Sequence, residues 1–218
     1  MKLYNYFRSS ASYRVRIALN LKGLDYEYVS VHLTRNGGEQ FADTYRALNP
    51  QALVPVLQDG ALALTQSLAI IEYLDETRPE PPLLPKTPAE RARVRALAQT
   101  VACEIHPLNN LRVLRYLTDT LGVSEETKNK WYQHWVGLGL QALETQLATS
   151  PYTGKFCHGD TPTLADCCLV PQLFNARRFK CDLSGFPTLL RIEQNCSALP
   201  AFQQAAPERQ PDAEAPGK

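Results

Sequence analysis

The segment Phe7-Arg8-Ser9-Ser10-Ala11-Ser12 carries residue types that suit the binding of an anion or a thiolate. It lies between a short strand-like segment and an amphipathic segment that predicts a helix. Backbone N–H groups and the positive end of the helix dipole converge at such a junction. The hydroxyls of Ser9 and Ser10 can donate hydrogen bonds to a thiolate, and this setting lowers a thiol pKa from its usual value of about 8.5. The alternative is that the serines only cap the helix.

Two later junctions offer main-chain and carboxylate contacts. Val54-Pro55 lies at the start of a predicted strand, where proline indicates an edge, a bulge or a cis bond. A cis bond would expose the N–H and C=O of Val54 to an extended peptide; an edge proline without a ligand is the alternative. Gln66-Ser67 lies where a strand turns into a helix. The Ser67 hydroxyl, the N–H groups of the helix start and the Gln66 amide suit a carboxylate, although serine is also an ordinary cap.

The cysteines give no sign of a disulfide or metal framework. No two of them form a CxxC pair, and no histidine cluster lies at zinc-ligand spacing. We therefore expect no metal, and reduced thiols that are mostly buried as small hydrophobic groups. The cysteines are Cys103, Cys157, Cys167, Cys168, Cys181 and Cys196. His32, His134 and His158 belong to no recognisable motif, and we assign them no role.

Composition excludes several classes of partner. The sequence has 218 residues, with 23 Lys plus Arg against 22 Asp plus Glu and a formal net charge of +1. This balance gives no basis for a nucleic-acid or membrane partner through bulk electrostatics. No uncharged apolar run approaches the ~18 residues that a membrane span needs. The N-terminal residues 1–5 lack the long apolar core of a secretory signal, so we expect a cytosolic, cytoplasmic protein.

A proline-rich segment divides the chain. The stretch PEPPLLPKTP, from Pro79 to Pro88, cannot continue a helix. We predict a first domain at 1–80, a linker at 81–88 and a second domain at 89–206. The remaining residues, 207–218 (PERQPDAEAPGK), are polar and proline-rich and predict a flexible tail.

Strand and helix signals alternate in the first domain, in the order β-α-β-α-β-β-α. The expected strands are 2–6, 26–33, 53–57 and 61–64, and the expected helices are 12–22, 41–48 and 67–77. Asp59-Gly60 marks the hairpin turn. One parallel βαβ unit and one antiparallel hairpin flanked by helices are typical of a thioredoxin-like domain. We expect Ser12 to cap the first helix, with Arg14, Arg16, Asn20 and Lys22 on its polar positions.

The second domain carries helix-period apolar positions only, at 89–117, 125–148, 163–179 and 187–196. Thr163 and Asp166 resemble a capping box at the start of the third of these segments. Pro107 interrupts the first segment, and a kink there would orient His106 and Asn109 toward a cleft. The prediction is therefore an α/β domain followed by an all-α domain.

The three junctions of the first domain together offer a thiol site, a main-chain site and a carboxylate site. These are the three functions of the tripeptide γ-Glu-Cys-Gly, glutathione. The runs that carry these sites resemble the zeta-class glutathione transferases over nearly the whole chain, about residues 1–206. The runs are FRSSASYRVRIALNLKG, NPQALVPVL, QSLAIIEYL, IHPLNNLRVL and GDTPTLADCCLVPQLFNARRF. Within the family motif Ser-Ser-Cys-x-(Trp, Tyr or His)-Arg-Val-Arg, Ala11 occupies the cysteine position, which removes any role for a protein thiol there.

The resemblance implies the glutathione transferase fold, a thioredoxin-like domain followed by a helical bundle, glutathione as cofactor and a homodimer. It also implies an isomerase that converts maleylacetoacetate to fumarylacetoacetate in tyrosine and phenylalanine breakdown, by reversible addition of the glutathione thiolate. Maleylpyruvate is the alternative substrate, although such an enzyme would favour a cation at Leu111. Further alternatives are a general transferase or α-haloacid dehalogenating enzyme, and a non-catalytic glutathione-binding module.

The resemblance assigns roles to particular residues. Ser9, Ser10 and Arg8 are expected to be catalytic. Arg8 and Arg177 are expected to bind a small dicarboxylate or diketo acid, because planar guanidinium groups suit carboxylates. An exposed helix face is the alternative for Arg177. The residues expected to bind glutathione are Ser9, Ser10, Gln51, Val54, Pro55, Gln66, Ser67, His106 and Asn109.

Overall fold

The computed structural model describes residues 1–214 and divides the chain into two units. The first unit contains Met1–Leu83 and the residues from Ser197 onward, and the second contains Leu84–Cys196. The predicted boundaries placed 197–206 in the helical domain instead. These residues group with the first unit because the helix that they form packs against a helix of that unit. Such a return of the chain leaves no mark in local composition.

The first unit is built on a four-stranded sheet of order β2-β1-β3-β4. The strands are β1 (Lys2–Asn5), β2 (Glu27–Ser30), β3 (Val56–Asp59) and β4 (Leu62–Thr65). β1 pairs parallel with β2, with Tyr4 opposite Val29, and antiparallel with β3, with Tyr4 opposite Val56. β3 and β4 form the antiparallel hairpin. This mixed sheet confirms the predicted thioredoxin-like arrangement.

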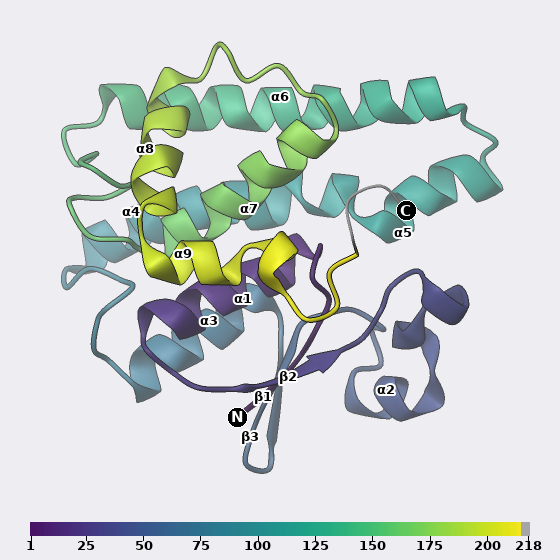
Figure 1. Ribbon diagram of the computed structural model, residues 1–218. Helices are drawn as coiled ribbons and strands as arrows, with labels where there is room; N and C mark the ends of the chain where they lie inside the picture. Colours follow the sequence, from purple (N-terminus) through teal and green to yellow (C-terminus); the bar gives the residue numbers. More distant parts are fainter. Residues whose placement is uncertain (215–218) are drawn as a thin grey trace. The chain divides into compact units, whose positions relative to one another are not determined.

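Four helices belong to this unit: α1 (Ser10–Leu21), α2 (Asp43–Leu48), α3 (Ser67–Thr77) and α9 (Pro200–Ala205). The short turns η1 (Arg35–Gly37), η2 (Glu39–Phe41) and η6 (Pro207–Arg209) complete it. α1 packs against both α3 and α9 (Figure 1). The bounds of α3 agree with the prediction, whereas α9 was not predicted.

The two arginines of α1 and the adjacent Lys22 are buried, which corrects their placement on the polar positions of the helix. Arg14 is 2% exposed, Arg16 0% and Lys22, at the end of the helix, 7%. Lys22 Nζ donates to the Asp75 carboxylate at 2.7 Å and to two backbone oxygens at 2.9 Å. Periodicity cannot reveal these partners because they lie on other segments of the chain. A buried cation is tolerated only when it is paired and hydrogen-bonded in this way.

The second unit is helical throughout its regular structure. Its helices are α4 (Pro88–Gln99), α5 (Leu111–Arg115), α6 (Glu125–Thr149), α7 (Leu164–Arg178) and α8 (Pro187–Ser197), with π-helical turns η3 (Thr100–Ile105) and η5 (Tyr116–Thr120) and the 3₁₀ turn η4 (Pro107–Asn109). The predicted segment 89–117 is therefore broken into several pieces. Pro107 lacks an N–H and its ring clashes with the carbonyl four residues earlier, which disfavours an α-helix across it, and the 3₁₀ turn η4 begins at this residue. α4 packs against α7.

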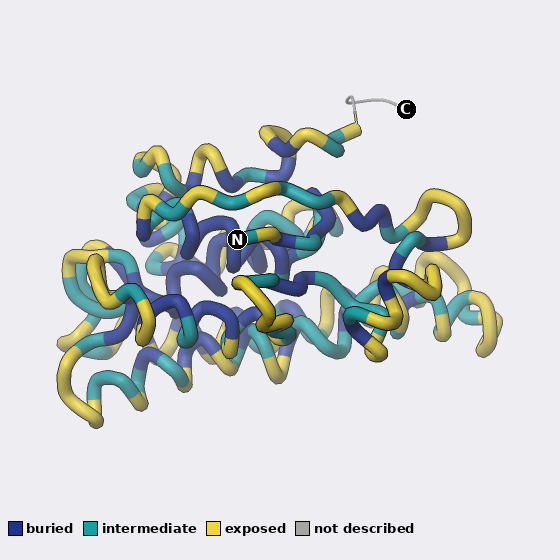
Figure 2. Tube along the Cα trace, turned by 90° about the horizontal axis from the view of Figure 1, so that it is seen from below, coloured by how far each residue is buried: buried dark blue, intermediate teal, exposed yellow. Residues whose placement is uncertain are grey.

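The start of α7 and the cysteines follow the predictions. The Asp166 carboxylate accepts hydrogen bonds from the N–H of Thr163 at 2.8 Å and of Cys157 at 2.9 Å, so the capping box is confirmed. Burial raises the pKa of Asp166. The cysteines are all free, and four of them are buried among the residues drawn in dark blue in Figure 2, namely Cys157, Cys167, Cys168 and Cys196.

The C-terminal residues differ from the predicted flexible tail. Residues 207–214 form the turn η6 and then hydrogen-bond to the first unit through Asp212. The remaining residues of the predicted tail, 215–218, lie outside the described residues. Polar composition misled the prediction because the donors to Asp212 come from β2 and from the loop after β1.

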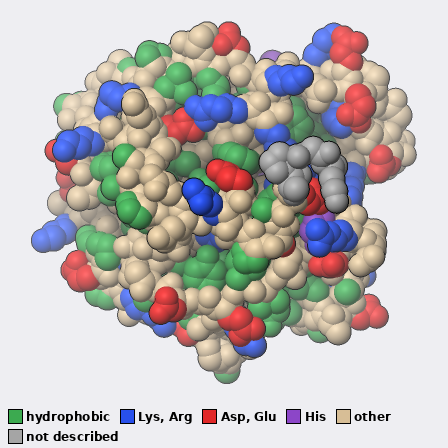
Figure 3. Space-filling view, viewed as in Figure 1, with side chains coloured by type: hydrophobic (Ala, Val, Ile, Leu, Met, Phe, Trp, Pro, Cys, Tyr) green, Lys and Arg blue, Asp and Glu red, His purple; other side chains and the backbone are tan. Residues whose placement is uncertain are grey.

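The surface carries charges of both signs. On the face shown in Figure 3, blue and red side chains alternate with uncharged ones. Within residues 1–214, no helix combines the length and the apolar character that crossing a membrane requires.

Candidate active site

Ser9 is the N-cap of α1, where the sequence had indicated Ser12. The Ser9 Oγ accepts a hydrogen bond from the N–H of Ser12 at 3.2 Å. A hydroxyl has two acceptor lone pairs and one O–H donor, so accepting this bond leaves the Ser9 proton available. The capping role and the thiolate-binding role are therefore compatible in one side chain.

Arg8 and Ser10 flank this serine. Ser10 is the first residue of α1 and is 3% exposed. The Arg8 guanidinium donates to the Tyr6 hydroxyl at 3.0 and 2.7 Å and lies 5.0 Å from the centroid of the Phe7 ring. The loop therefore presents a cation and two hydroxyls beside the positive end of a twelve-residue helix, which suits negative charge.

Val54-Pro55 has the predicted cis peptide bond. The pairing of β3 with β1 ends at Val56, so Val54 lies beyond the ladder of hydrogen bonds between these strands. The preceding carbonyl, of Leu53, accepts from the Tyr45 hydroxyl and from the Asn49 side-chain amide, both at 2.7 Å. These bonds fix the approach to Val54, whose main-chain groups lie at an unpaired strand end suited to an extended peptide.

Gln66 and Ser67 form the start of α3. Gln66 has a positive φ of 67°, a backbone region that non-glycine residues seldom adopt. Its side-chain amide donates to the Gln51 side-chain oxygen at 3.2 Å, so the structure brings these two predicted residues together. The Ser67 Oγ accepts from the buried Arg14 guanidinium at 3.2 Å. A serine at a helix N-terminus with a cation behind it suits a carboxylate.

His106 and Asn109 belong to the second unit. The His106 Nε2 lies 3.5 Å from the Asn110 side-chain nitrogen, and the Asn109 side-chain amide donates to the Ile105 carbonyl at 3.4 Å. The Asn109 Oδ1 is buried and has no hydrogen-bond partner among the described residues. That oxygen is an acceptor which a ligand N–H would satisfy. The roles of both residues remain predictions.

Arg177 lies in the last turn of α7 and is paired within its own unit. Its guanidinium makes a two-point contact with the Glu193 carboxylate on α8. Hydrogen bonding to Glu193 raises the pKa of Arg177. The side chain is 49% exposed. It has the solvated position that was the alternative to substrate binding, and a substrate carboxylate would have to compete with Glu193 for it.

Sequence reasoning missed three charged residues near the predicted site: Arg14 behind Ser67, and Asp212 and Glu214 beside the loop of Arg8. The two acids come from the far end of the chain, so no local pattern links them to residues 7–9. Among residues 1–214 no group of three or more His, Cys, Asp or Glu side chains is arranged to hold a metal.

Two family models match the sequence, one in each of the two units. The family described as "Glutathione S-transferase, N-terminal domain" matches residues 3–82. The family described as "Glutathione S-transferase, C-terminal domain" matches residues 139–194. A protein of Vibrio cholerae named probable maleylacetoacetate isomerase is 58% identical over 211 residues, which cover 97% of each chain.

Solved structures of similar fold belong to the same kind of enzyme. A bacterial maleylpyruvate isomerase, described as a zeta-class glutathione S-transferase in its holo form, has a TM-score of 0.95 and 52% identity, and the match covers 98% of this chain and all of that one. Maleylacetoacetate isomerase from Methylobacterium extorquens, solved with bound malonate and GSH, has a TM-score of 0.94 and 45% identity, with 99% and 100% of the chains covered.

Proposed function

Because this chain belongs to the zeta class of the glutathione S-transferase family, we propose that it is a glutathione-dependent cis-trans isomerase acting on maleylacetoacetate. The full-length match to a protein named probable maleylacetoacetate isomerase, at 58% identity, carries this proposal. The local chemistry supports it, since a cis-trans isomerase of this kind needs a stabilised thiolate and cations for a dicarboxylate.

The residues of the first unit fit glutathione at three points. The free Ser9 proton, with Ser10 and the start of α1, suits the cysteinyl thiolate. The main chain of Val54, beyond the strand ladder, suits the peptide backbone. Ser67 and Gln66, at the start of α3 with Arg14 behind them, suit a terminal carboxylate. Each contact offers a donor or acceptor that complements one part of the tripeptide.

When bound, glutathione supplies a thiolate that adds reversibly to the cis double bond, which permits rotation about it. The Ser9 hydroxyl donates a hydrogen bond to the thiolate, and Ser10 and the dipole of α1 favour the same negative charge. Arg8 binds a substrate carboxylate through its planar guanidinium. Tyr6 holds this guanidinium through its hydroxyl, so Arg8 is oriented before the substrate arrives.

The first test is a spectrophotometric assay of maleylacetoacetate conversion with and without glutathione. Turnover that requires glutathione supports the proposal. If glutathione binds but neither maleylacetoacetate nor maleylpyruvate is converted, the isomerase proposal is wrong. Conjugation of aryl halides or dehalogenation of α-haloacids would then be assayed, and failure of both would leave a glutathione-binding module.

Maleylpyruvate is the second candidate substrate, because a maleylpyruvate isomerase has a TM-score of 0.95 to this chain at 52% identity. One feature favours maleylacetoacetate. Leu111, which begins α5, is apolar at a position where a maleylpyruvate enzyme would favour a cation. Parallel assays of the two substrates at equal concentrations decide between them, and conversion of maleylpyruvate alone would replace the first proposal.

We extend the proposal to assembly and location: a homodimer in the cytoplasm. The homodimer follows from the family resemblance, and the location follows from the free cysteines, which are typical of a reducing compartment. Light scattering coupled to size-exclusion chromatography tests the first, since a dimer has twice the chain mass of 24.4 kDa. Fractionation of the producing cells tests the second.

A further inference from the structure

The C-terminal segment holds the loop that carries Arg8 and Ser9. After η6, the buried Gln210 donates through its side-chain amide to the carbonyls of Gln204 and Ala206, both at 2.8 Å. These two hydrogen bonds fix the turn that precedes Asp212. The Asp212 carboxylate then accepts a hydrogen bond from the N–H of Phe7 at 3.3 Å.

The same carboxylate is anchored to β2. Its Oδ2 accepts from the Ser30 hydroxyl at 2.9 Å, and its Oδ1 accepts a short hydrogen bond from the Tyr28 hydroxyl. Burial and this bond raise the pKa of Tyr28, so its hydroxyl stays protonated as the donor. Asp212 thus joins an edge strand to the residue that precedes Arg8.

Arg16 holds the loop from the other side. Its fully buried guanidinium donates to the carbonyl of Phe7 at 2.9 Å, to that of Tyr6 at 3.4 Å and to the Asn5 side-chain oxygen at 3.0 Å. It also donates to the carbonyl of Ala205 at 3.0 Å, at the end of α9. The carbonyls of the loop are therefore bound by Arg16, and the N–H of Phe7 is bound by Asp212.

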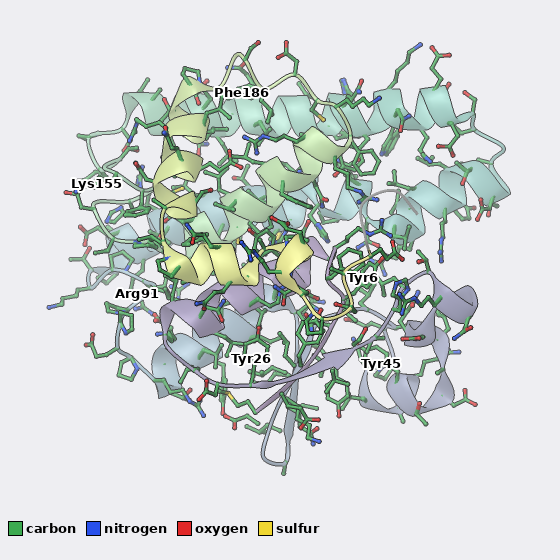
Figure 4. The ribbon with its side chains drawn as sticks, in the orientation of Figure 1. Tyr6, Tyr26, Tyr45, Arg91, Lys155 and Phe186 are labelled. Carbon is green, nitrogen blue, oxygen red and sulfur yellow. The ribbon has the colours of Figure 1, made fainter. Side chains whose placement is uncertain are left out.

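These contacts bear directly on Ser9. The N–H of Ser9 donates to the Tyr6 carbonyl at 3.0 Å, so the position of the serine follows that of residues 6 and 7. Tyr6, labelled in Figure 4, is also the residue whose hydroxyl orients Arg8. A shift of the Phe7 peptide would therefore displace both Ser9, which donates a hydrogen bond to the thiolate, and Arg8, which binds the substrate carboxylate.

We propose that Asp212 is a positioning residue of the active site, which holds Ser9 and Arg8 in place through the N–H of Phe7. The inference rests on the proposed function, because it concerns the same thiol site. The proposed peptide and carboxylate contacts of glutathione lie just before β3 and at the start of α3, outside this loop. Loss of the Asp212 contact therefore impairs thiolate stabilisation and turnover more than it impairs glutathione affinity.

The test compares Asp212→Ala with Asp212→Asn. Alanine removes both the hydrogen bonds and the charge. Asparagine removes the charge but keeps an oxygen that can accept from Phe7 and Ser30, and its N–H₂ can donate to the Tyr28 hydroxyl. Glu208→Gln is the matched control, because Glu208 is an exposed acid of the same segment.

Three quantities are measured for the full-length variants: the pKa of bound glutathione by ultraviolet absorption of its thiolate, kcat, and the dissociation constant of glutathione. Asp212→Ala is expected to raise the thiol pKa by about half a unit or more and to lower kcat about tenfold. The dissociation constant is expected to change less than about threefold. Asp212→Asn retains most of the wild-type behaviour, and Glu208→Gln all of it.

The sign of the change in the thiol pKa shows whether Asp212 acts by positioning Ser9 or only through its negative charge. If Asp212 acted only as a nearby anion, both variants would lower the thiol pKa equally, because removal of a negative charge favours a thiolate.

Hydrogen exchange at the Phe7 amide, measured by NMR, tests the contact without any turnover: faster exchange in Asp212→Ala, but not in Glu208→Gln, is expected. Unchanged exchange, or the opposite sign of the pKa change, overturns the inference. Wild-type protein that binds glutathione but converts no substrate would instead refute the proposed function.

Discussion

Single side chains near the thiol loop serve more than one purpose. Ser9 caps α1 through its oxygen and keeps its proton for a ligand. Tyr6 accepts from Arg8 through its hydroxyl while its carbonyl binds Arg16 and the N–H of Ser9. Substitutions at such positions affect both stability and turnover, so a test must separate the two effects.

Replacement of Ser9 allows this separation. Ser9→Ala removes the cap and the thiolate donor, so we expect a loss of about 1 kcal/mol in unfolding free energy and at least a tenfold fall in kcat (about 1.4 kcal/mol). Ser9→Gly preserves most of the capping energy but not the hydroxyl. It should therefore unfold near the wild-type denaturant concentration and yet show the same fall in kcat. A stability loss in Ser9→Ala that Ser9→Gly largely avoids, with kcat unchanged in both variants, would assign Ser9 to capping alone.

Glu214 is a counter-charge for Arg8. Its carboxylate lies 3.7 Å from the Arg8 guanidinium and 3.3 Å from the Nε2 of the buried His32, although the latter contact is not aligned as a hydrogen bond. A substrate carboxylate competes with this anion. Glu214→Gln should therefore lower the KM for the dicarboxylate by about two- to fivefold, as expected for a partly exposed ion pair.

The control for Glu214→Gln is a substrate without a carboxylate. Conjugation of glutathione to a neutral aryl halide should keep its KM, because this reaction does not use the cation of Arg8. Steady-state kinetics with both substrates provide the measurement. An equal change for the two substrates would contradict a role through Arg8.

At the scale of elements, sequence reasoning succeeded where local signals decide the structure. α3 has the predicted bounds because an apolar stripe, with Ile70, Ile71 and Leu74 buried, defines it, and the capping box of α7 is a local motif. Sequence reasoning failed where the structure depends on partners that are distant in the sequence. Arg16 is a polar residue on a helix, and its burial is explained by acceptors on other segments, namely the Asn5 side chain and the carbonyls of Tyr6, Phe7 and Ala205. Asp212 could not be assigned for the same reason.

The ends of β3 and α3 are joined by Asp59. Its carboxylate accepts from the Arg78 guanidinium at 2.8 Å and from the Tyr73 hydroxyl at 3.0 Å. Hydrogen bonds to Arg78 and then Tyr73 lower the pKa of Asp59 below its ordinary value of 3.8. This contribution to stability is thus fully present above that value, and it is lost as the pH falls through 3.8 toward the lower folded-state pKa.

Denaturant unfolding of Asp59→Asn across this pH range tests the linkage. We expect the variant to be less stable than the wild type near neutral pH, with a difference that shrinks as the pH falls below 3.8. Asp25→Asn, at an exposed aspartate of the same unit, should show no such trend. A difference for Asp59→Asn that is constant with pH would refute the linkage.

At the scale of the whole molecule, the first unit is discontinuous in sequence. Met1–Leu83 is completed by α9 and the residues that follow it. Phe202 on α9 is 1% exposed, and α9 packs against α1. The segment that the sequence indicated as the end of the helical domain is therefore part of the core beneath the thiol loop.

Phe202→Ala tests this assignment. Loss of a buried phenylalanine typically costs about 3–5 kcal/mol, and we expect hydrogen exchange to accelerate in α1 and the sheet well before it does in α6 and α7. Gln204→Ala, at an exposed position of the same helix, is the control. Uniform acceleration in both units would mean that they unfold as one body, and no acceleration in α1 would contradict the packing.

The discontinuity also sets an order of events during synthesis. A ribosome releases the sheet, the thiol loop and α1 first, then the whole of the second unit, and only afterwards α9 and Asp212. Until those last residues emerge, Arg16 lacks the carbonyl of Ala205 and the N–H of Phe7 lacks its carboxylate. Contacts between segments so distant in sequence form slowly. The nascent chain therefore stays without a finished thiol site until the residues that follow the second unit have been synthesised.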